Sequence, residues 1–228
     1  QKPARRINSP YQLPSEYPLK KVIASISGSI FGTAITDTLF LFVERQSIES
    51  LHFFIKGPID ITWSHPIMTR RGIEHYRGGI TDNTAYLLLA IRTLTSKDSL
   101  HVCSDFAKKL KDFLSQGLPE FQLSIQNSSH PPSILKIARD PIFTTDPTSA
   151  AKKYWRTVGE TSSGNDALTR AVVAGCYLFW DEEKVADNAQ KLCRITHYDP
   201  RCAFAAVSIA LTISRLIKWR CGIMDQID

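Results

Sequence analysis

A group of oxygen-bearing side chains lies at the start of an apolar stretch of the chain. Thr81, Asp82 and Asn83 are consecutive and lead directly into an apolar run that ends near Thr95. Hard cations such as Mg²⁺ prefer oxygen ligands, commonly one or two carboxylates with water completing the shell. The three side chains could supply such ligands if Glu44 folds alongside them. The other interpretation is a helix N-cap, in which Thr81 or Asp82 accepts a backbone N–H and holds no metal.

Two later stretches contain residues that could contact a ligand. Gly164 and Asn165 precede a predicted helix and could present backbone N–H groups to a phosphate, although this pair of residues is also a common turn. His197 lies two residues before an Asp-Pro pair that marks a helix start, so it could contact a ligand or cap the preceding element. Arg170 and Arg201 could each pair with a phosphate or with a carboxylate.

Helices must position these residues, and the first predicted helix covers the apolar segment 22–43. A membrane span is the weaker reading of this segment because it contains Asp37, and a charge at the centre of a bilayer costs at least about 2.5 kcal/mol. We therefore expect a buried core helix that ends near Glu44. Gly28 and Gly32 are four residues apart on one face, where they would let a neighbouring helix approach closely.

The rest of the chain also reads as helical. We find no convincing alternating strand and no internal repeat, and a long connection over residues 118–146 contains four prolines. The sequence therefore predicts an all-α fold. Apolar periodicity, N-caps and glycine stops place the further helices over residues 83–95, 101–116, 147–158, 167–180, 182–194 and 200–220.

Composition and cysteine usage set the class of protein. The 228 residues are 43% hydrophobic and 22% charged, which is typical of a globular chain and excludes collagen, low-complexity and wholly disordered chains. The five cysteines are too few and too scattered for a disulfide scaffold, and the absence of a C-x-x-C pair gives no sign of structural zinc. Their odd number and wide spacing favour a reducing compartment.

The net charge of +6 is concentrated near the N-terminus. Residues 1–21 contain five basic residues and one acidic residue. Residues 1–20 also contain four prolines, which predicts an extended basic leader followed by a single helical domain over residues 21–228. Nucleic-acid binding would need Lys and Arg clustered on one folded surface, and the sequence predicts no such surface.

Four motifs in this order resemble those of the ADP-ribosylglycohydrolase family. The opening G-x-x-x-G-x-x-x-G-D of that family is similar to residues 28–37, and its T-D-D-T is similar to residues 81–84. Its G-N-G-A-x-M-R is similar to residues 164–170, and its T-H-x-D-P-R to residues 196–201. The resemblance, which extends over residues 22–220, implies a compact orthogonal multi-helix bundle and Mg²⁺-dependent hydrolysis of the bond between ADP-ribose and an acceptor.

The resemblance also implies a role for each matched residue. Asp82 and Glu44 would act in catalysis. The same two residues, with Thr81 and Asn83, would bind the two magnesium ions of the family. The residues lining the ADP-ribose cleft would be Gly164, Asn165, His197 and Asp37.

The sequence departs from the family pattern at several positions. Asn83 replaces the second aspartate of the metal motif, Asp166 replaces a glycine, and Phe40 stands where a small residue is usual. Family members continue beyond the point matching Asp228 to a D-x-D-T motif, and this chain has no D-x-D, so we expect it to lack the C-terminal helices of the family. We expect an ADP-ribosylglycohydrolase-like protein with impaired catalysis. The alternative is a pseudoenzyme that binds ADP-ribose or serves as a structural subunit of a larger assembly.

The resemblance implies partners as well. ADP-ribose or an ADP-ribosylated protein would be the ligand, and a protein partner could supply the missing helices. We expect neither a nucleic acid nor a membrane as partner. From the cysteine usage we expect an intracellular location, either cytoplasmic or nuclear, or mitochondrial if a presequence has been removed ahead of Gln1.

Overall fold

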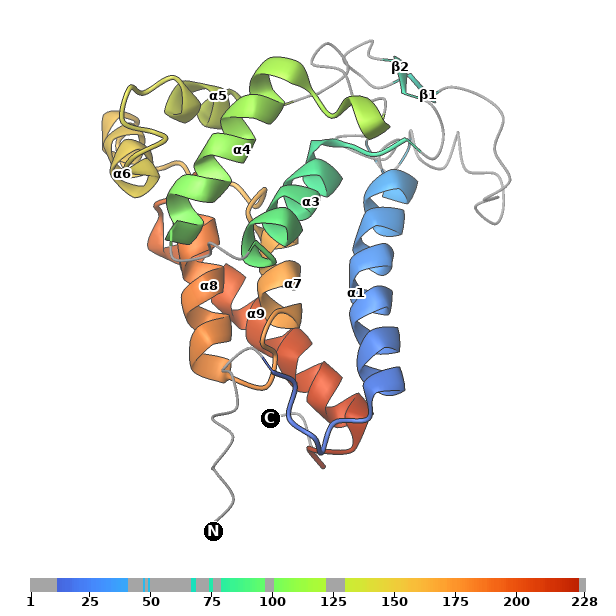
Figure 1. Cartoon of the computed structure of the whole chain (residues 1–228). Coiled ribbons are helices and arrows are strands. Elements are labelled where there is room, and N and C mark those ends of the chain that lie inside the picture. The colour runs from blue at the N-terminus through green and yellow to red at the C-terminus, as the bar shows by residue number, and fades with distance from the viewer. Residues whose placement is uncertain are drawn as a thin grey trace.

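The computed structural model describes residues 12–40, 79–96, 101–121 and 130–225, with residues 47, 49, 67–68 and 74–75. These residues form a helical bundle (Figure 1), as the sequence predicted. A two-residue hairpin, in which Ile67 pairs with His75, is the one departure from an all-helical arrangement among them. The elements are α1 (Leu19–Phe40), β1 (Ile67–Met68), β2 (Glu74–His75), α3 (Asp82–Leu94), α4 (Val102–Gln116), η3 (Pro119–Phe121), α5 (Pro132–Ala138), α6 (Pro147–Thr157), α7 (Leu168–Cys176), α8 (Glu182–Arg194) and α9 (Pro200–Cys221).

Helix α7 lies at the centre of the bundle. It packs against α3, α8 and α9, and the core around it consists mainly of alanine and leucine side chains. Helices α7 and α9 approach closely at Gly175, where a Cβ atom would lie 2.5 Å from the backbone oxygen of Ala210 and 2.8 Å from Cβ of Ile213. The absence of a side chain at Gly175 therefore lets α7 and α9 pack in direct backbone contact.

Side-chain caps begin four of the helices. Thr81, Asp146, Asp181 and Asp199 each accept a backbone N–H from the first turn of α3, α6, α8 and α9, respectively. Proline at the first position of α6 and α9 also favours a helix start, because a backbone N–H at that position would have no acceptor within the helix. The predicted start of α9 is confirmed.

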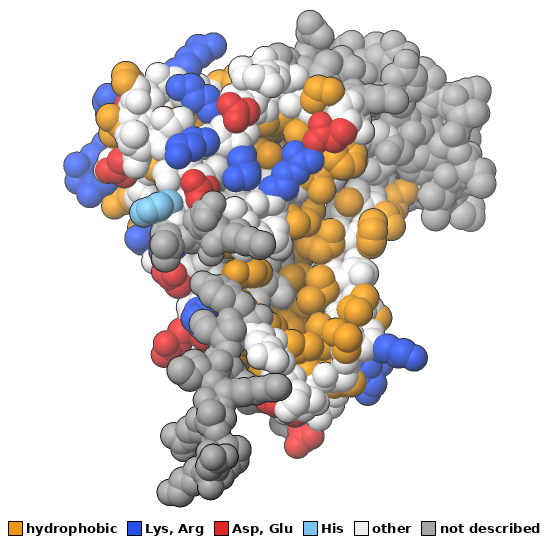
Figure 2. Space-filling model, viewed as in Figure 1, with side chains coloured by type: hydrophobic (Ala, Val, Ile, Leu, Met, Phe, Trp, Pro, Cys, Tyr) orange, Lys and Arg blue, Asp and Glu red, His pale blue; other side chains and the backbone are white. Residues whose placement is uncertain are grey.

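Helix α1 differs from its prediction, because it is largely exposed. Val22 is the one buried residue among those of its side chains that the structure describes. Leu19, Ile23, Phe31 and Ile35 are 60%, 56%, 65% and 53% exposed. Figure 2 shows hydrophobic side chains gathered over the surface where α1 lies. The prediction of a buried core helix was therefore wrong.

The glycine face of α1 explains part of this error. A Cβ atom at Gly28 or Gly32 would meet no described atom outside its own helix within 4 Å, so no helix of the described ranges packs there. Helix α1 instead contacts the bundle through Val22, Ile26 and Ile30, which pack near α7 and α9. Apolar composition indicated burial, but only one narrow face is buried.

Length and composition alone would allow both α1 and α9 to cross a bilayer, with mean hydropathies of 1.3 and 1.5. A core helix of a soluble protein and a signal sequence satisfy the same criterion, so this observation carries little weight. In α9, 39% of the apolar window is buried within the bundle, compared with 6% in α1.

Two smaller predictions also need correction. The connection over residues 118–146 is not irregular throughout, because it contains η3 and α5. Helix α7 ends at Cys176 and not near residue 180, because Leu178 adopts a left-handed φ of 51° that a helix cannot continue through.

Candidate functional site

Asp37, in the last turn of α1, accepts hydrogen bonds from the beginning of α3. The Thr81 hydroxyl lies 2.8 and 2.7 Å from its two carboxylate oxygens, and the Thr84 hydroxyl donates to Oδ2 at 2.6 Å. The backbone N–H groups of Thr81 and Thr84 donate to Oδ2 at 3.4 and 3.3 Å. A carboxylate is favoured at a helix N-terminus because the N–H groups there carry partial positive charge. Asp37 thus ties α1 to α3.

The structure confirms the N-cap interpretation of Thr81. Its hydroxyl accepts the backbone N–H of Asn83 at 3.1 Å while it donates to Asp37. The side-chain amide of Asn83 also donates to Asp37 Oδ1 at 3.3 Å. Three residues predicted to lie at the site, Asp37, Thr81 and Asn83, are therefore in direct contact.

Asp82 faces a different set of partners. It is buried, with Oδ2 3.8 Å from Nδ1 of His130, and the same nitrogen lies 3.0 Å from the Tyr86 hydroxyl. Burial raises the pKa of Tyr86 well above its usual value, and the charge of Asp82 adds to the effect. Burial lowers the pKa of His130 to about 4, so this imidazole is neutral at pH 7.

A second group of hydrogen-bonded side chains joins α7 to the residues that follow α8 and to the loop that precedes α7. Arg170 Nη2 donates to the Thr196 hydroxyl at 2.6 Å, and this hydroxyl lies 2.8 Å from His197 Nδ1. His197 Nε2 in turn lies 3.4 Å from Asp166 Oδ2. Because Thr196 accepts from Arg170, its own proton is free to be donated to His197 Nδ1. This network assigns the neutral His197 tautomer that carries its proton on Nε2, facing Asp166.

The pKa shifts in this second group agree with that assignment. Burial lowers the pKa of His197, and the nearby Arg170 charge acts in the same direction. Burial alone would raise the pKa of Asp166, but the hydrogen bond and charge of His197 outweigh it and the net pKa is lowered. At neutral pH the pair is therefore an ionised carboxylate beside a neutral imidazole.

Gly164 lies against the same pair. A Cβ atom at Gly164 would lie 2.9 Å from Asp166 Oδ2 and 3.2 Å from His197 Nε2. The structure thus brings Gly164 and His197 together. Asn165 is exposed, and its side chain makes no hydrogen bond within the described part of the chain.

Arg170 and Tyr86 connect two clusters of polar side chains. The Asp37 cluster lies at the start of α3, and the His197 cluster contains Thr196, His197 and Asp166. The Arg170 guanidinium carbon lies 6.0 Å from the Tyr86 ring centre and 5.1 Å from the Phe106 ring centre. Arg170 is 1% exposed, and burial lowers its pKa. Arg170 was predicted to pair with a phosphate or a carboxylate, and no role was predicted for Tyr86 or His130. One sequence signal could have indicated His130 as a site residue, because this histidine lies directly before a Pro-Pro pair at a helix start.

The side chains near α3 include oxygen donors of the type that a hard cation prefers, but Asp82 faces His130 whereas Asp37 faces Thr81, Asn83 and Thr84. Asp37 and Asp82 are carboxylates, and Thr81 and Asn83 supply neutral oxygens, which matches the usual requirement for one or two carboxylates with water. The described residues contain no group of three or more His, Cys, Asp or Glu side chains placed to hold a metal. Glu44, the remaining predicted ligand, lies outside the described residues, as does the side chain of Phe40.

Comparison with known proteins gave one match. A family model described as ADP-ribosylglycohydrolase matches residues 19–227, which include both clusters. No curated protein and no solved structure matches the chain.

Proposed function

The chain belongs to the ADP-ribosylglycohydrolase family, and we propose that it binds ADP-ribose while its hydrolysis of the ADP-ribose–acceptor bond is impaired. The observation that carries this proposal is the side chain of Asn83. Its amide donates a hydrogen bond to Asp37, at a position where the family motif has a second carboxylate. A neutral amide brings no charge to a site that must hold divalent cations.

Magnesium is the cation we propose. When bound, it would supply positive charge to orient the ribose and a water molecule. Asp37, Thr81, Asp82 and Asn83 are the described residues that would hold it. Asp37 already receives three side-chain hydrogen bonds, and these donors would have to rearrange for a cation to reach its carboxylate.

Asp166 provides a second argument for weak activity. Its carboxylate lies beside His197 and Gly164, where the resemblance places the ADP-ribose cleft. A diphosphate close to this carboxylate would be repelled, and the pKa of Asp166 is lowered, so the carboxylate stays ionised at neutral pH. We therefore expect binding to depend more on the ribose and adenine than on the diphosphate.

A structural role is the second candidate function. Leu19, Ile23, Phe31 and Ile35 are each more than half exposed on α1. Exposed apolar patches of this kind are typical of interaction surfaces. A protein partner that contributes further helices could cover them, and the chain would then act as a subunit of a larger assembly.

We also propose a partner class and a location. The partner would be ADP-ribose itself or an ADP-ribosylated protein, with neither a nucleic acid nor a membrane involved. An intracellular location, cytoplasmic, nuclear or mitochondrial, is supported by the five cysteines, all of which are free thiols.

Calorimetric titration of the full chain with ADP-ribose, with and without Mg²⁺, tests the proposal. We expect saturable binding that His197→Ala weakens and that Lys111→Ala, on the exposed face of α4, leaves unchanged. We expect little release of ADP-ribose from an ADP-ribosylated protein by the wild type. Rapid release by the wild type would overturn the proposed impairment. No heat from a folded sample would remove ligand binding and leave the structural role.

A further inference from the structure

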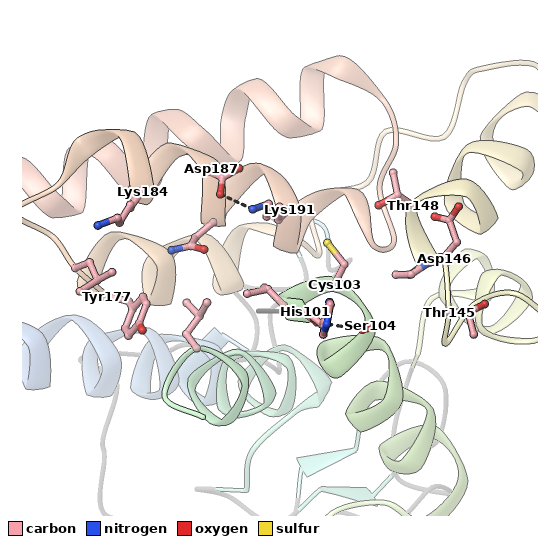
Figure 3. Close-up of a pocket in the computed structure, with 15 residues that line it drawn as sticks. His101, Cys103, Ser104, Thr145, Asp146, Thr148, Tyr177, Lys184, Asp187 and Lys191 are labelled. Carbon is pink, nitrogen blue, oxygen red and sulfur yellow. Dashed lines mark hydrogen bonds and ion pairs between the residues drawn. The ribbon is translucent and has the colours of Figure 1, made fainter. Parts of the chain in front are cut away.

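A separate cavity of about 520 Å³ lies between the beginnings of α4 and α6 and one face of α8. Figure 3 shows Lys184, Asp187 and Lys191 along one wall, with His101, Cys103 and Ser104 from the start of α4 opposite them. The cavity includes Leu94, at the C-terminal end of α3. The Asp37 cluster is at the other end of this 13-residue helix, about 20 Å away at about 1.5 Å per residue. None of the residues that line the cavity belongs to the candidate site described above, either near Asp37 or near His197, so the cavity is distinct from that site.

The side chain of Asn188 lines this cavity. Asn188 is 9% exposed and lines the cavity, and its side chain makes no hydrogen bond with any other described residue. Its amide atoms are not among the fully buried polar atoms without a partner, so they are accessible to a molecule in the cavity. An amide offers both donors and an acceptor. A polar ligand in the cavity would satisfy Asn188.

The α8 wall adds two lysines on the same face as Asn188. Lys184, Asn188 and Lys191 are spaced at i, i+4 and i+7, so they lie along one side of the helix. Nζ of Lys184 lies 3.0 Å from Oδ2 of Asp181, and Nζ of Lys191 lies 2.6 Å from Oδ2 of Asp187. Their side chains are 44% and 48% exposed. Ion pairs this exposed contribute little and exchange readily, so both ammonium groups can turn to an anion in the cavity.

The start of α4 provides further donors. His101 occupies the N-cap position but makes no side-chain capping hydrogen bond. Among the described residues, no side chain accepts the first backbone N–H groups of this 15-residue helix. The start of α6 differs, because Asp146 caps it by accepting from the Ser149 N–H. An anion would accordingly be favoured at α4.

We propose that this cavity binds a small phosphorylated molecule. The phosphate would be held by the two α8 lysines and the first turn of α4, and Asn188 would bind a polar group on the rest of the molecule. The volume is larger than one phosphate needs and lies within the range of about 300–1,000 Å³ that is usual for small-molecule sites. The inference does not depend on ADP-ribose binding at His197.

Cys103 allows the site to be located directly. It lies in the cavity wall and is only partly buried, whereas the other four cysteines are buried. The full chain would be alkylated with N-ethylmaleimide at pH 8.5, because burial raises the pKa of the Cys103 thiol. AMP and ribose 5-phosphate are the probes, and adenosine is the uncharged control. We expect either phosphate ester to slow alkylation of Cys103 at least fivefold, and adenosine to have no effect.

Variants identify the groups responsible. Lys184→Met with Lys191→Met, and separately Asn188→Leu, should each weaken AMP binding at least tenfold in calorimetry. Lys108→Met, on the exposed face of α4, is the matched control and should bind as the wild type does. The lysine variant alters only partly exposed side chains, so it keeps the test valid if Asn188→Leu fails to fold.

Three results would overturn the proposal. One is the absence of Cys103 protection by both phosphate esters. Another is equal protection by adenosine, since the anion would then not be recognised. The last is AMP binding that survives in Asn188→Leu and is lost in His197→Ala, which would place it in the ADP-ribose cleft. Titration with ADP-ribose tests that cleft separately, so failure at one site leaves the other interpretable.

Discussion

Asp37 shows how a single carboxylate can organise this site. It accepts hydrogen bonds from the side chains of Thr81, Asn83 and Thr84 and from two backbone N–H groups. Each hydrogen bond to a charged group contributes about 1.5–3 kcal/mol. Five donors from the N-cap and first turn of α3 thus stabilise the negative charge of Asp37, and the Asn83 amide is one of them.

Replacing Asn83 with aspartate tests whether the donors around Asp37 take the place of a cation. Asn83→Asp removes the amide that donates to Asp37 and places a second carboxylate beside the first. We expect unfolding free energy to fall by about 1–3 kcal/mol without divalent cations, because a hydrogen bond is lost and like charges meet. Millimolar Mg²⁺ should restore much of that loss, measured as a rise in melting temperature larger than in the wild type.

Asn83→Ala is the control for this prediction. It removes the same hydrogen bond but adds no charge, so its melting temperature should respond to Mg²⁺ no more than that of the wild type. An equal Mg²⁺ response in Asn83→Asp and Asn83→Ala would show that position 83 does not help to hold a cation.

Contacts between residues that are close in the sequence were predicted better at this site than contacts between residues that are far apart. Thr81 could be identified as an N-cap because capping depends on the few residues around it. His130 and Tyr86 could not, because their contact joins residues 44 apart in the chain and depends on how α3 packs. Asp37 was found through the family motif, but its contacts with Thr81 and Thr84 are likewise long-range.

At the scale of elements, the start of α9 depends on one aspartate. Asp199 accepts from the backbone N–H of Arg201 at 2.8 Å, and its other oxygen accepts from Arg201 Nη2 at 2.8 Å and Trp155 Nε1 at 3.3 Å. The hydrogen bonds from Arg201 lower the pKa of Asp199 to about 2. The carboxylate is therefore more stable when ionised in the folded chain than in the unfolded one.

A pH prediction follows from that lowered pKa. The stabilising contribution of Asp199 is fully present above its unfolded pKa of about 3.8 and is lost as the pH falls toward about 2. Asp199→Asn should keep the cap and lose this acid dependence. Asp199→Ala should also lose about 1 kcal/mol of unfolding free energy at pH 7. Chemical denaturation at pH 7, 4 and 3 measures both effects, and an unchanged acid dependence in Asp199→Asn would contradict the assignment.

Two helical glycines offer a matched comparison of packing. A Cβ at Gly175 would lie 2.5 Å from the Ala210 oxygen, whereas one at Gly28 would have no described neighbour outside its helix within 4 Å. Gly175→Ala should destabilise the protein by about 2 kcal/mol or more, because α7 and α9 must separate. Gly28→Ala should stabilise it by about 0.5–1 kcal/mol through helix propensity alone. Thermal melting of both variants checks the pair, and destabilisation by Gly28→Ala would mean that another part of the chain covers this face.

These glycines also show what the sequence could not predict about the elements. Amphipathic periodicity correctly placed α4 and α8, whose apolar residues lie on one face. Gly28 and Gly32 suggested a close helix crossing because of their spacing, yet the close crossing occurs at Gly175. A glycine four residues from another is a local pattern, whereas a crossing point depends on the path of the whole chain.

At the scale of the whole molecule, α7 lies at the centre of the bundle and packs against α9, whereas α1 is largely exposed. Helix α1 contacts the bundle along the narrow face of Val22, Ile26 and Ile30 and through Asp37 at its C-terminal end. Amide protons in regions with few buried contacts exchange through local opening at low free energy. The first turns of α1 should therefore exchange faster than α7 and α9.

Hydrogen exchange measured by mass spectrometry can test whether Asp37 is the main attachment of α1. Thr84→Val removes the 2.6 Å hydrogen bond to Asp37 with little change in shape. We expect exchange in the C-terminal half of α1 to become about tenfold faster, since a hydrogen bond to a carboxylate contributes about 1.5–3 kcal/mol. Helix α9 should be unaffected. Thr95→Val, whose hydroxyl bonds only within α3, is the control and should leave α1 unchanged. If Thr84→Val accelerates exchange equally in α1, α7 and α9, then α1 opens only with the whole bundle, and Asp37 stabilises the entire fold.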